Sequence, residues 1–105
     1  MPDELMQKEI RGCLNQDGQL IQLPGKRKKR LIALCYVAEQ IPENQTYTEK
    51  EFNALLNGLH TFGDPATLRR ELFDYYLIDR EKNGSGYRLS ASRPSAAELI
   101  EKYGS

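Results

Sequence analysis

The stretch YTEKEFNALLNGLHTFGDPATLRREL, residues 47–72, decides the fold that we expect for this chain. Thr48 and Glu51 have the spacing of a capping box, so a helix is predicted to begin at Thr48. Its apolar positions at i, i+3, i+4 and i+7, which give it one buried face, are Phe52, Leu55, Leu56 and Leu59. Asp64 and Pro65 then supply an N-cap acid and a proline at the first helical position, so a second helix is predicted from Asp64 to about Tyr76. Residues 47–72 therefore predict two helices joined by a short turn.

The flanking segments predict three further helices and one β-hairpin. Residues 3–14 and 95–103 each carry an apolar stripe at helical spacing, and residues 31–41 carry a stronger one that Pro42 ends. Residues 19–23 are expected to be a short extended stretch, and Tyr47 is placed to be a short strand residue. The turn cluster NGSG, residues 83–86, separates LIDREK from YRLS, which is typical of a hairpin.

This order of elements predicts a mainly α fold with a small β-hairpin (α+β), organised as a winged helix-turn-helix with an extra helix at each terminus. The 105 residues are enough for one hydrophobic core, so we expect a single domain over residues 1–105. Within it, residues 1–25 form an N-terminal helix and a short extended segment, residues 26–90 the winged-helix core, and residues 91–105 the C-terminal helix.

The charges are balanced in number and uneven in position. Fifteen Lys and Arg residues match fifteen Asp and Glu residues, so the whole-chain charge does not require a nucleic-acid partner. The run KRKKR, residues 26–30, is nevertheless five consecutive cations, whose repulsion is relieved by solvent, by nearby acids or by a polyanion. Two interpretations follow: a solvated first helical turn balanced by Glu39, Glu43 and Glu49, or a phosphate-binding patch.

Several classes of protein are not expected. No stretch approaches the ~18 apolar residues that a membrane span needs, and the N-terminus is acidic and polar, so a soluble cytoplasmic protein is expected. Cys13, Cys35 and the single histidine, His60, are too few for a metal site or a disulfide framework, and we expect both thiols to be buried. His60 is expected at a helix C-terminus, where a partly positive ring is favoured. No acid, base and nucleophile are grouped, so no enzyme activity and no cofactor are predicted.

Three motifs of the chain resemble those of a bacterial family. They are a basic run before a helix, YTEKEFNALL at residues 47–56, and D-x-x-TLRREL followed by L-x-DR at residues 64–80. On these motifs residues 26–88 resemble the family catalogued as domain of unknown function 2087. The resemblance implies a domain that occurs alone or fused to bacterial transcription regulators. The chain departs from the family pattern at Tyr76, where a small residue such as glycine is expected before the leucine.

The predicted fold suggests where DNA would bind. In a winged helix the helix after the turn can lie in a major groove, while the hairpin touches the flanking backbone. We therefore expect a duplex-DNA-binding transcription regulator with phosphate contacts from the basic run and the hairpin, and base contacts from residues 67–70. The expected DNA-binding residues are Lys26, Arg27, Lys28, Lys29, Arg30, Thr67, Arg69, Arg70, Arg80 and Arg88.

Two alternatives to DNA binding remain open. Either arginine of the pair Arg69–Arg70 could instead bond an acid and tie two helices together, and the hairpin arginine Arg88 could pair across the ribbon. The acids of the two helices, which would repel phosphate unless paired, are Glu49, Glu51, Glu71 and Asp74. The second alternative is a protein-interaction or dimerisation module of the same fold, with Ile32, Tyr36 and Phe73 exposed for a partner, a second copy or a fused regulator domain.

Overall fold

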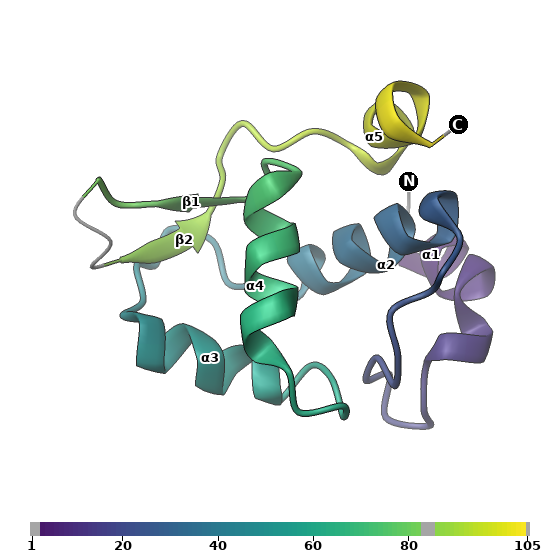
Figure 1. The fold of residues 1–105 in the computed structure, drawn as a ribbon, viewed down its shortest axis with the longest axis horizontal. Coiled ribbons are helices and arrows are strands. Elements are labelled where there is room, and N and C mark those ends of the chain that lie inside the picture. Colours follow the sequence, from purple (N-terminus) through teal and green to yellow (C-terminus); the bar gives the residue numbers. More distant parts are fainter. Residues whose placement is uncertain (1–2, 83–85, 105) are drawn as a thin grey trace.

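The computed structural model describes residues 3–82 and 86–104. Five α-helices and two short strands follow one another along the chain (Figure 1). They are α1 (Asp3–Glu9), a 3-10 turn (Arg11–Cys13), α2 (Arg27–Glu39), α3 (Glu49–Asn57), α4 (Pro65–Asp74), β1 (Ile78–Arg80), β2 (Tyr87–Leu89) and α5 (Ala96–Tyr103). This mainly helical fold with a two-stranded antiparallel sheet confirms the predicted α+β class. Most of the predicted NGSG turn lies outside the described residues. None of the described helices is long and apolar enough to cross a membrane.

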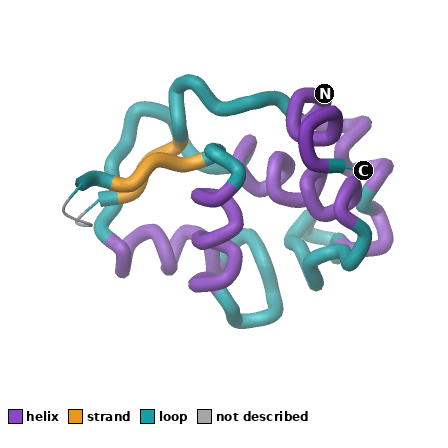
Figure 2. The backbone as a smooth tube through the Cα atoms, turned by 45° about the horizontal axis from the view of Figure 1, so that its top comes forward, coloured by secondary structure: helices purple, strands orange, loops and turns teal. Residues whose placement is uncertain are grey.

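Helix α2 is the centre of the fold. Every residue from Leu31 to Ala38 is buried, so α2 is covered on all sides instead of on one stripe. It is covered by α1, α4 and α5, and α1 and α5 lie at the end of the molecule away from the hairpin (Figure 2). This burial corrects the expectation that Ile32 and Tyr36 are exposed, because their exposed fractions are 0% and 5%. The Tyr36 hydroxyl donates to the Gly18 carbonyl at 2.8 Å, which uses its polar end inside the fold.

The helix ends follow the predicted capping residues. The Thr48 hydroxyl accepts from the Glu51 amide while the Glu51 carboxylate accepts from the Thr48 amide, which confirms the capping box. The Asp64 carboxylate accepts from the Thr67 amide at 3.1 Å, with Pro65 as the first residue of α4. Both helices therefore begin where local chemistry satisfies their free N–H groups.

Helix α4 ends two residues earlier than predicted, in a tight reversal into β1. The Leu77 amide donates to the Leu72 carbonyl and the Tyr76 amide to the Phe73 carbonyl, the two bonds of a Schellman motif. Tyr76 occupies the position of this motif that favours glycine, with φ of +64°. The position where the family pattern has a small residue is therefore one where the backbone is left-handed.

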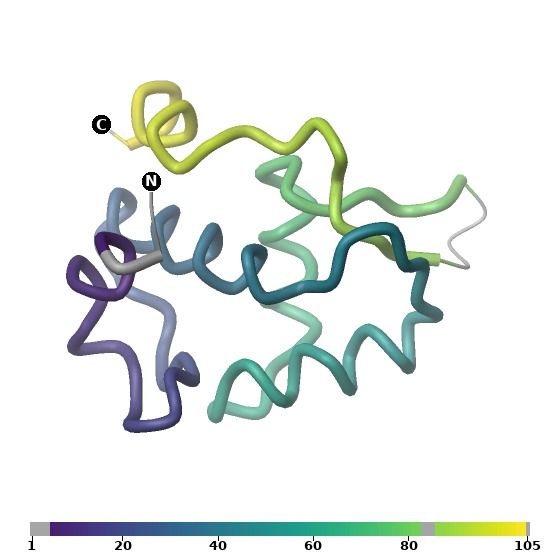
Figure 3. The backbone as a smooth tube through the Cα atoms, turned by 180° about the vertical axis from the view of Figure 1, so that it is seen from behind, coloured from purple at the N-terminus to yellow at the C-terminus, as the bar shows by residue number. Residues whose placement is uncertain are grey.

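The hairpin is joined to the start of α3. Its register pairs Ile78 with Leu89 and Arg80 with Tyr87, and Tyr47 forms a bridge to Tyr87 on the free side of β2. Both amides of the Tyr47–Tyr87 bridge donate across it, at 2.7 and 2.8 Å. The predicted short strand at Tyr47 is thus a single bridge residue, and Figure 3 shows this segment beside the hairpin.

Candidate nucleic-acid interface

A shallow groove separates α4 from the hairpin. It has a volume of about 330 Å³ and is lined by Ala66, Thr67, Arg69, Arg70, Phe73, Arg80 and Tyr87. Thr67, Arg70 and Phe73 follow one another at intervals of three residues along α4. They therefore lie on one face of the helix. Four predicted DNA-binding residues therefore line one groove, although they come from α4 and β1: Thr67, Arg69, Arg70 and Arg80.

Arg69 is held in place inside this surface. Its guanidinium donates to the Asn53 side chain, lies 3.2 Å from the Glu49 carboxylate, and sits 5.3 Å from the centre of the Tyr87 ring. The side chain is only 18% exposed. Its charge is therefore neutralised by α3, and the prediction that Arg69 contacts bases is replaced by the alternative that it ties α3 to α4 and the hairpin. Arg70, one residue on, is exposed and has no ion pair among the described residues.

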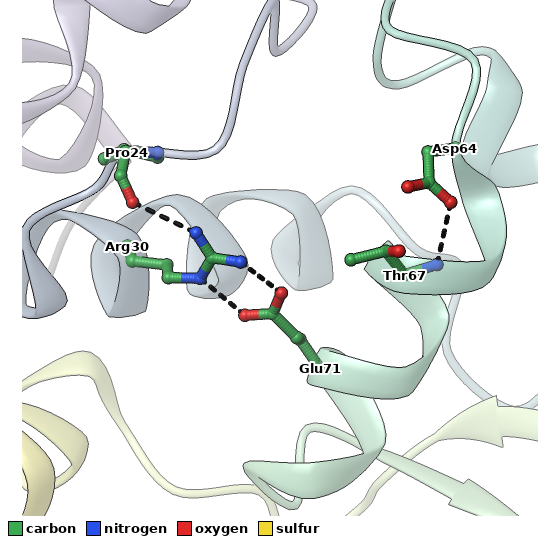
Figure 4. Close-up of polar contacts among 5 residues, drawn as sticks. All are labelled: Pro24, Arg30, Asp64, Thr67 and Glu71. Carbon is green, nitrogen blue, oxygen red and sulfur yellow. Dashed lines mark hydrogen bonds and ion pairs between the residues drawn. The ribbon is translucent and has the colours of Figure 1, made fainter.

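Arg30 also serves the fold. Its guanidinium spans the Glu71 carboxylate of α4 with two hydrogen bonds, one of them 2.6 Å long, and donates to the Pro24 carbonyl at 3.3 Å (Figure 4). The hydrogen bonds that Arg30 donates to the Glu71 carboxylate raise the pKa of Arg30 above its ordinary value. Arg30, the last cation of the basic run, thus forms an ion pair that joins α2 to α4. Arg30 was expected to contact a phosphate, and in the structure Glu71 occupies its guanidinium instead.

The hairpin arginines lie on opposite faces of the ribbon. Arg88 is paired in register with Asp79, and their side chains are 3.9 Å apart, whereas Arg80 is opposite Tyr87. Because side chains alternate along a strand, the Arg80 side faces the groove and the Arg88 side faces away from it. Arg88, one of the expected DNA-binding residues, is thus paired across the ribbon, as the alternative interpretation has it, and its partner is Asp79.

The first four cations of the basic run remain exposed. Residues Lys26 to Lys29 begin α2, and none of them is in an ion pair among the described residues. Figures 1 and 3 agree that α4 lies between this end of α2 and the hairpin, with the start of α2 and α4 toward the same side. The start of α2, which carries these four residues, therefore lies next to α4 on the side away from the hairpin, and the Arg30–Glu71 pair joins the two helices there.

Most acids near this side are already engaged. Glu71 bonds Arg30, Glu49 pairs with Arg69, and the Glu51 carboxylate accepts from the Thr48 amide in the capping box. Among the four acids expected to repel phosphate, Asp74 alone has no such partner within the described ranges. Two of the four acids expected to repel phosphate, Glu49 and Glu71, are therefore neutralised by arginines of the protein itself.

His60 and the cysteines lie away from this interface. His60 is buried, its Nδ1 lies 2.6 Å from the Leu56 carbonyl, and its Nε2 accepts from the Asp64 amide at 3.0 Å. Both ring nitrogens are therefore used inside the fold, where His60 links the end of α3 to the residue that caps α4. Cys35 is buried as predicted, while Cys13 is only half-buried.

Two residues that shape the groove, Tyr87 in its lining and Asn53 behind it, were missed in the sequence. Tyr87 forms the floor, stacked on Phe52 with ring centres 5.5 Å apart, and Asn53 orients Arg69. The alternation in Tyr87-Arg88-Leu89 indicates that the tyrosine points inward, so this signal was present. Nothing local to Asn53 predicts its partner, because the bond joins residues 16 apart in the chain.

Comparison with known proteins gives one match. A family model described as "Uncharacterized protein conserved in bacteria (DUF2087)" matches residues 19–89. The match extends from the segment before α2 to the last residue of β2, so the groove and the basic run lie within it, and α1 and α5 lie outside. No curated protein and no solved structure matches the chain.

Proposed function

Because the chain belongs to the uncharacterized bacterial DUF2087 family, whose description gives no activity, we propose its function from the geometry of its surface. The domain is a winged helix-turn-helix that binds duplex DNA as part of a transcription regulator. Helix α4 lies in the major groove, and the β1–β2 hairpin is the wing. This function needs no catalytic group, metal or cofactor.

The arrangement of α3, α4 and the hairpin supports this proposal. Helix α4 follows α3 after a short connection, and the chain then reverses into the hairpin, which also pairs with Tyr47 before α3. The ten residues of α4 form a rod about 15 Å long at 1.5 Å per residue. A major groove about 12 Å wide accepts such a helix. The length of α4 therefore permits the helix to enter a major groove and to present two or three side chains to base edges.

The observation that carries the proposal is the presence, on three neighbouring elements of a chain with zero net charge, of exposed cations that form no ion pair among the described residues. The start of α2, with Lys26 to Lys29, is joined to α4 by the Arg30–Glu71 pair, and Arg70 of α4 and Arg80 of β1 line one groove. Phosphates of a duplex lie on both sides of a helix placed in its groove, so flanking cations are where backbone contacts are needed.

The start of α2 adds an energetic argument. A helix N-terminus carries a partial positive charge, and cations there are unfavourable. The first turn of α2 has no acid, and its N-cap residue Lys26 makes no side-chain capping bond. The sequence thus keeps four cations where local stability disfavours them. A bound polyanion would convert this repulsion into attraction.

Fluorescence anisotropy with a labelled random duplex at about 50 and 200 mM salt tests the proposal. If about five phosphates are neutralised, the plot of log K against log salt has a slope of about −4.5. A variant with Lys26–Lys29 replaced by glutamine loses most of this slope, whereas Lys8→Gln on α1 leaves it unchanged. Absence of binding to any duplex at about 50 mM salt would end the proposal.

Phe73 supports a second candidate function, a protein-interaction module. Its side chain is 45% exposed on α4, and Tyr76 nearby is 61% exposed. Exposed aromatic residues are frequent anchors in protein interfaces. Light scattering of the wild type and Phe73→Ser tests self-association through this residue: a mass that falls in the variant supports it, and a monomer in both forms excludes it.

A further inference from the structure

We infer that the groove between α4 and β1 holds the backbone of one DNA strand, with a single phosphate bound between Arg70 and Arg80. This inference rests on the proposed DNA binding and names the point on the surface that fixes the register of the protein. It assigns to Arg70 and Arg80 a role that differs from that of the other cations: they bind one phosphate together.

The charge of the groove points to an oxyanion. Arg70 enters from α4 and Arg80 from β1, and no acidic residue lines the groove within the described part of the chain. Guanidinium groups bind phosphate and carboxylate through paired N–H donors, and two of them on facing walls suit a tetrahedral group with several free oxygens. Since neither arginine forms an ion pair with a carboxylate among residues 3–82 and 86–104, the pair is available for an external anion.

The floor of the groove is rigid. Arg69 is fixed by Asn53, Glu49 and the Tyr87 ring, and Tyr87 is in turn stacked on Phe52. The floor therefore does not collapse into the space between the two walls. Phe73, 45% exposed at the rim, offers an apolar surface to the deoxyribose next to the phosphate.

The size of the groove decides between a whole duplex and part of one strand. From Ala66 to Phe73 the groove follows α4 for about 10 Å, at 1.5 Å per residue. Its volume of about 330 Å³ is too small for a duplex and sufficient for a short piece of sugar and phosphate. The start of α2, which carries the four exposed cations, lies on the side of α4 away from the hairpin, so it is placed to meet another part of the duplex.

Glutamine variants of the two hairpin arginines provide a matched test. Arg80 and Arg88 are both exposed and lie on paired strands, but the register places Arg80 at the groove and Arg88 beside Asp79. Anisotropy with the full chain and a labelled duplex is measured for Arg70→Gln, Arg80→Gln, Arg88→Gln and the double variant Arg70→Gln/Arg80→Gln. Thermal unfolding with and without inorganic phosphate, at constant ionic strength, is measured on the same proteins.

We expect Arg70→Gln and Arg80→Gln each to weaken duplex binding about tenfold, the effect of losing a hydrogen bond to a charged group. Arg88→Gln changes binding less than about twofold, as is usual for a surface position away from such contacts. The double variant makes the salt slope less steep by about 0.9, the value for one phosphate. A decrease of about 1.8 would show two separate phosphates and overturn the shared site.

Two other results would also overturn the inference. Equal effects of Arg80→Gln and Arg88→Gln, in a wild type that binds duplex, would reject the groove and leave the proposed function standing. A rise in Tm on adding inorganic phosphate that Arg80→Gln removes, with duplex binding unchanged, would assign the groove to a free phosphate. A wild type that binds no duplex rejects the proposed function itself.

Discussion

Arg30 and Lys28 belong to the same basic run, yet their surroundings predict opposite effects of replacing each by glutamine. Arg30→Gln leaves the Glu71 carboxylate without its cation. Breaking a fully buried ion pair costs about 3–5 kcal/mol and breaking an exposed one less than about 1 kcal/mol. The Arg30 and Glu71 side chains are 32% and 12% exposed, which lies between these limits, so we expect a loss of about 2 kcal/mol. For a domain of this size that loss lowers Tm by roughly 8 °C.

Lys28→Gln has the reverse profile. Lys28 is exposed and has no ion pair among the described residues, so the free energy of unfolding changes by less than about 0.5 kcal/mol. If Lys28 contacts a phosphate, its removal makes the salt slope of duplex binding less steep by about 0.9, whereas Arg30→Gln leaves the slope unchanged. Circular dichroism gives Tm and anisotropy gives the slope.

A double variant, Arg30→Gln/Glu71→Gln, is the control for the ion pair. It removes both charges, so it is more stable than Arg30→Gln alone, because no carboxylate is left unpaired. The reasoning is refuted if Arg30→Gln and Lys28→Gln have the same Tm. It is equally refuted if Arg30→Gln reduces the salt slope as much as Lys28→Gln does.

Three further predictions concern stability and reactivity. We expect the free energy of unfolding of Tyr76→Gly to exceed that of Tyr76→Ala by about 0.5–1 kcal/mol. Glycine relieves about 1–2 kcal/mol of left-handed backbone strain, which is more than it loses through its greater entropy in the unfolded chain. Urea unfolding measures the difference, and equal stabilities would contradict it. Side-chain and backbone hydrogen bonds from Thr67, in the first turn of α4, lower the pKa of Asp64 from 3.8. The contribution of Asp64 to stability is therefore complete well above pH 3.8 and is lost as the pH falls through its lower pKa in the folded state. Asp64→Asn removes this part of the dependence of Tm on pH, and an unchanged dependence would argue against it. Burial raises the pKa of the Cys35 thiol to about 11, whereas Cys13 is half-buried. At pH 8 we therefore expect a thiol reagent to label only Cys13 in the native protein and both cysteines after unfolding, as counted by mass spectrometry. Labelling of Cys35 in the native Cys13→Ser variant would be inconsistent with its burial.

The helix boundaries could be predicted because their causes are local. Thr48 with Glu51, and Asp64 with Pro65, satisfy free backbone groups within one turn, so the residues that decide each boundary are a few positions apart. The left-handed backbone at Tyr76 was not predicted. From the sequence we expected only a small residue there, and the structure gives the physical reason, because glycine adopts a positive φ without strain.

The roles of the cations could not be predicted from the sequence. Arg69 and Arg70 are neighbours in the chain, and only the packing of α3 against α4 neutralises the first and leaves the second exposed. Arg30 resembles the four cations before it until α4 brings Glu71 to its guanidinium across 41 positions of sequence. Ile32 and Tyr36 became core residues because α1 and α5 cover the side of α2 that its own apolar stripe left open.

By itself, then, the order of residues determined where the helices and the hairpin form, since capping, turn and periodicity act between near neighbours. Which arginines stay available to a polyanion was decided only when distant segments came together. A charge is neutralised by whatever lies within a few ångströms of it, and that distance is set by the packing of the helices.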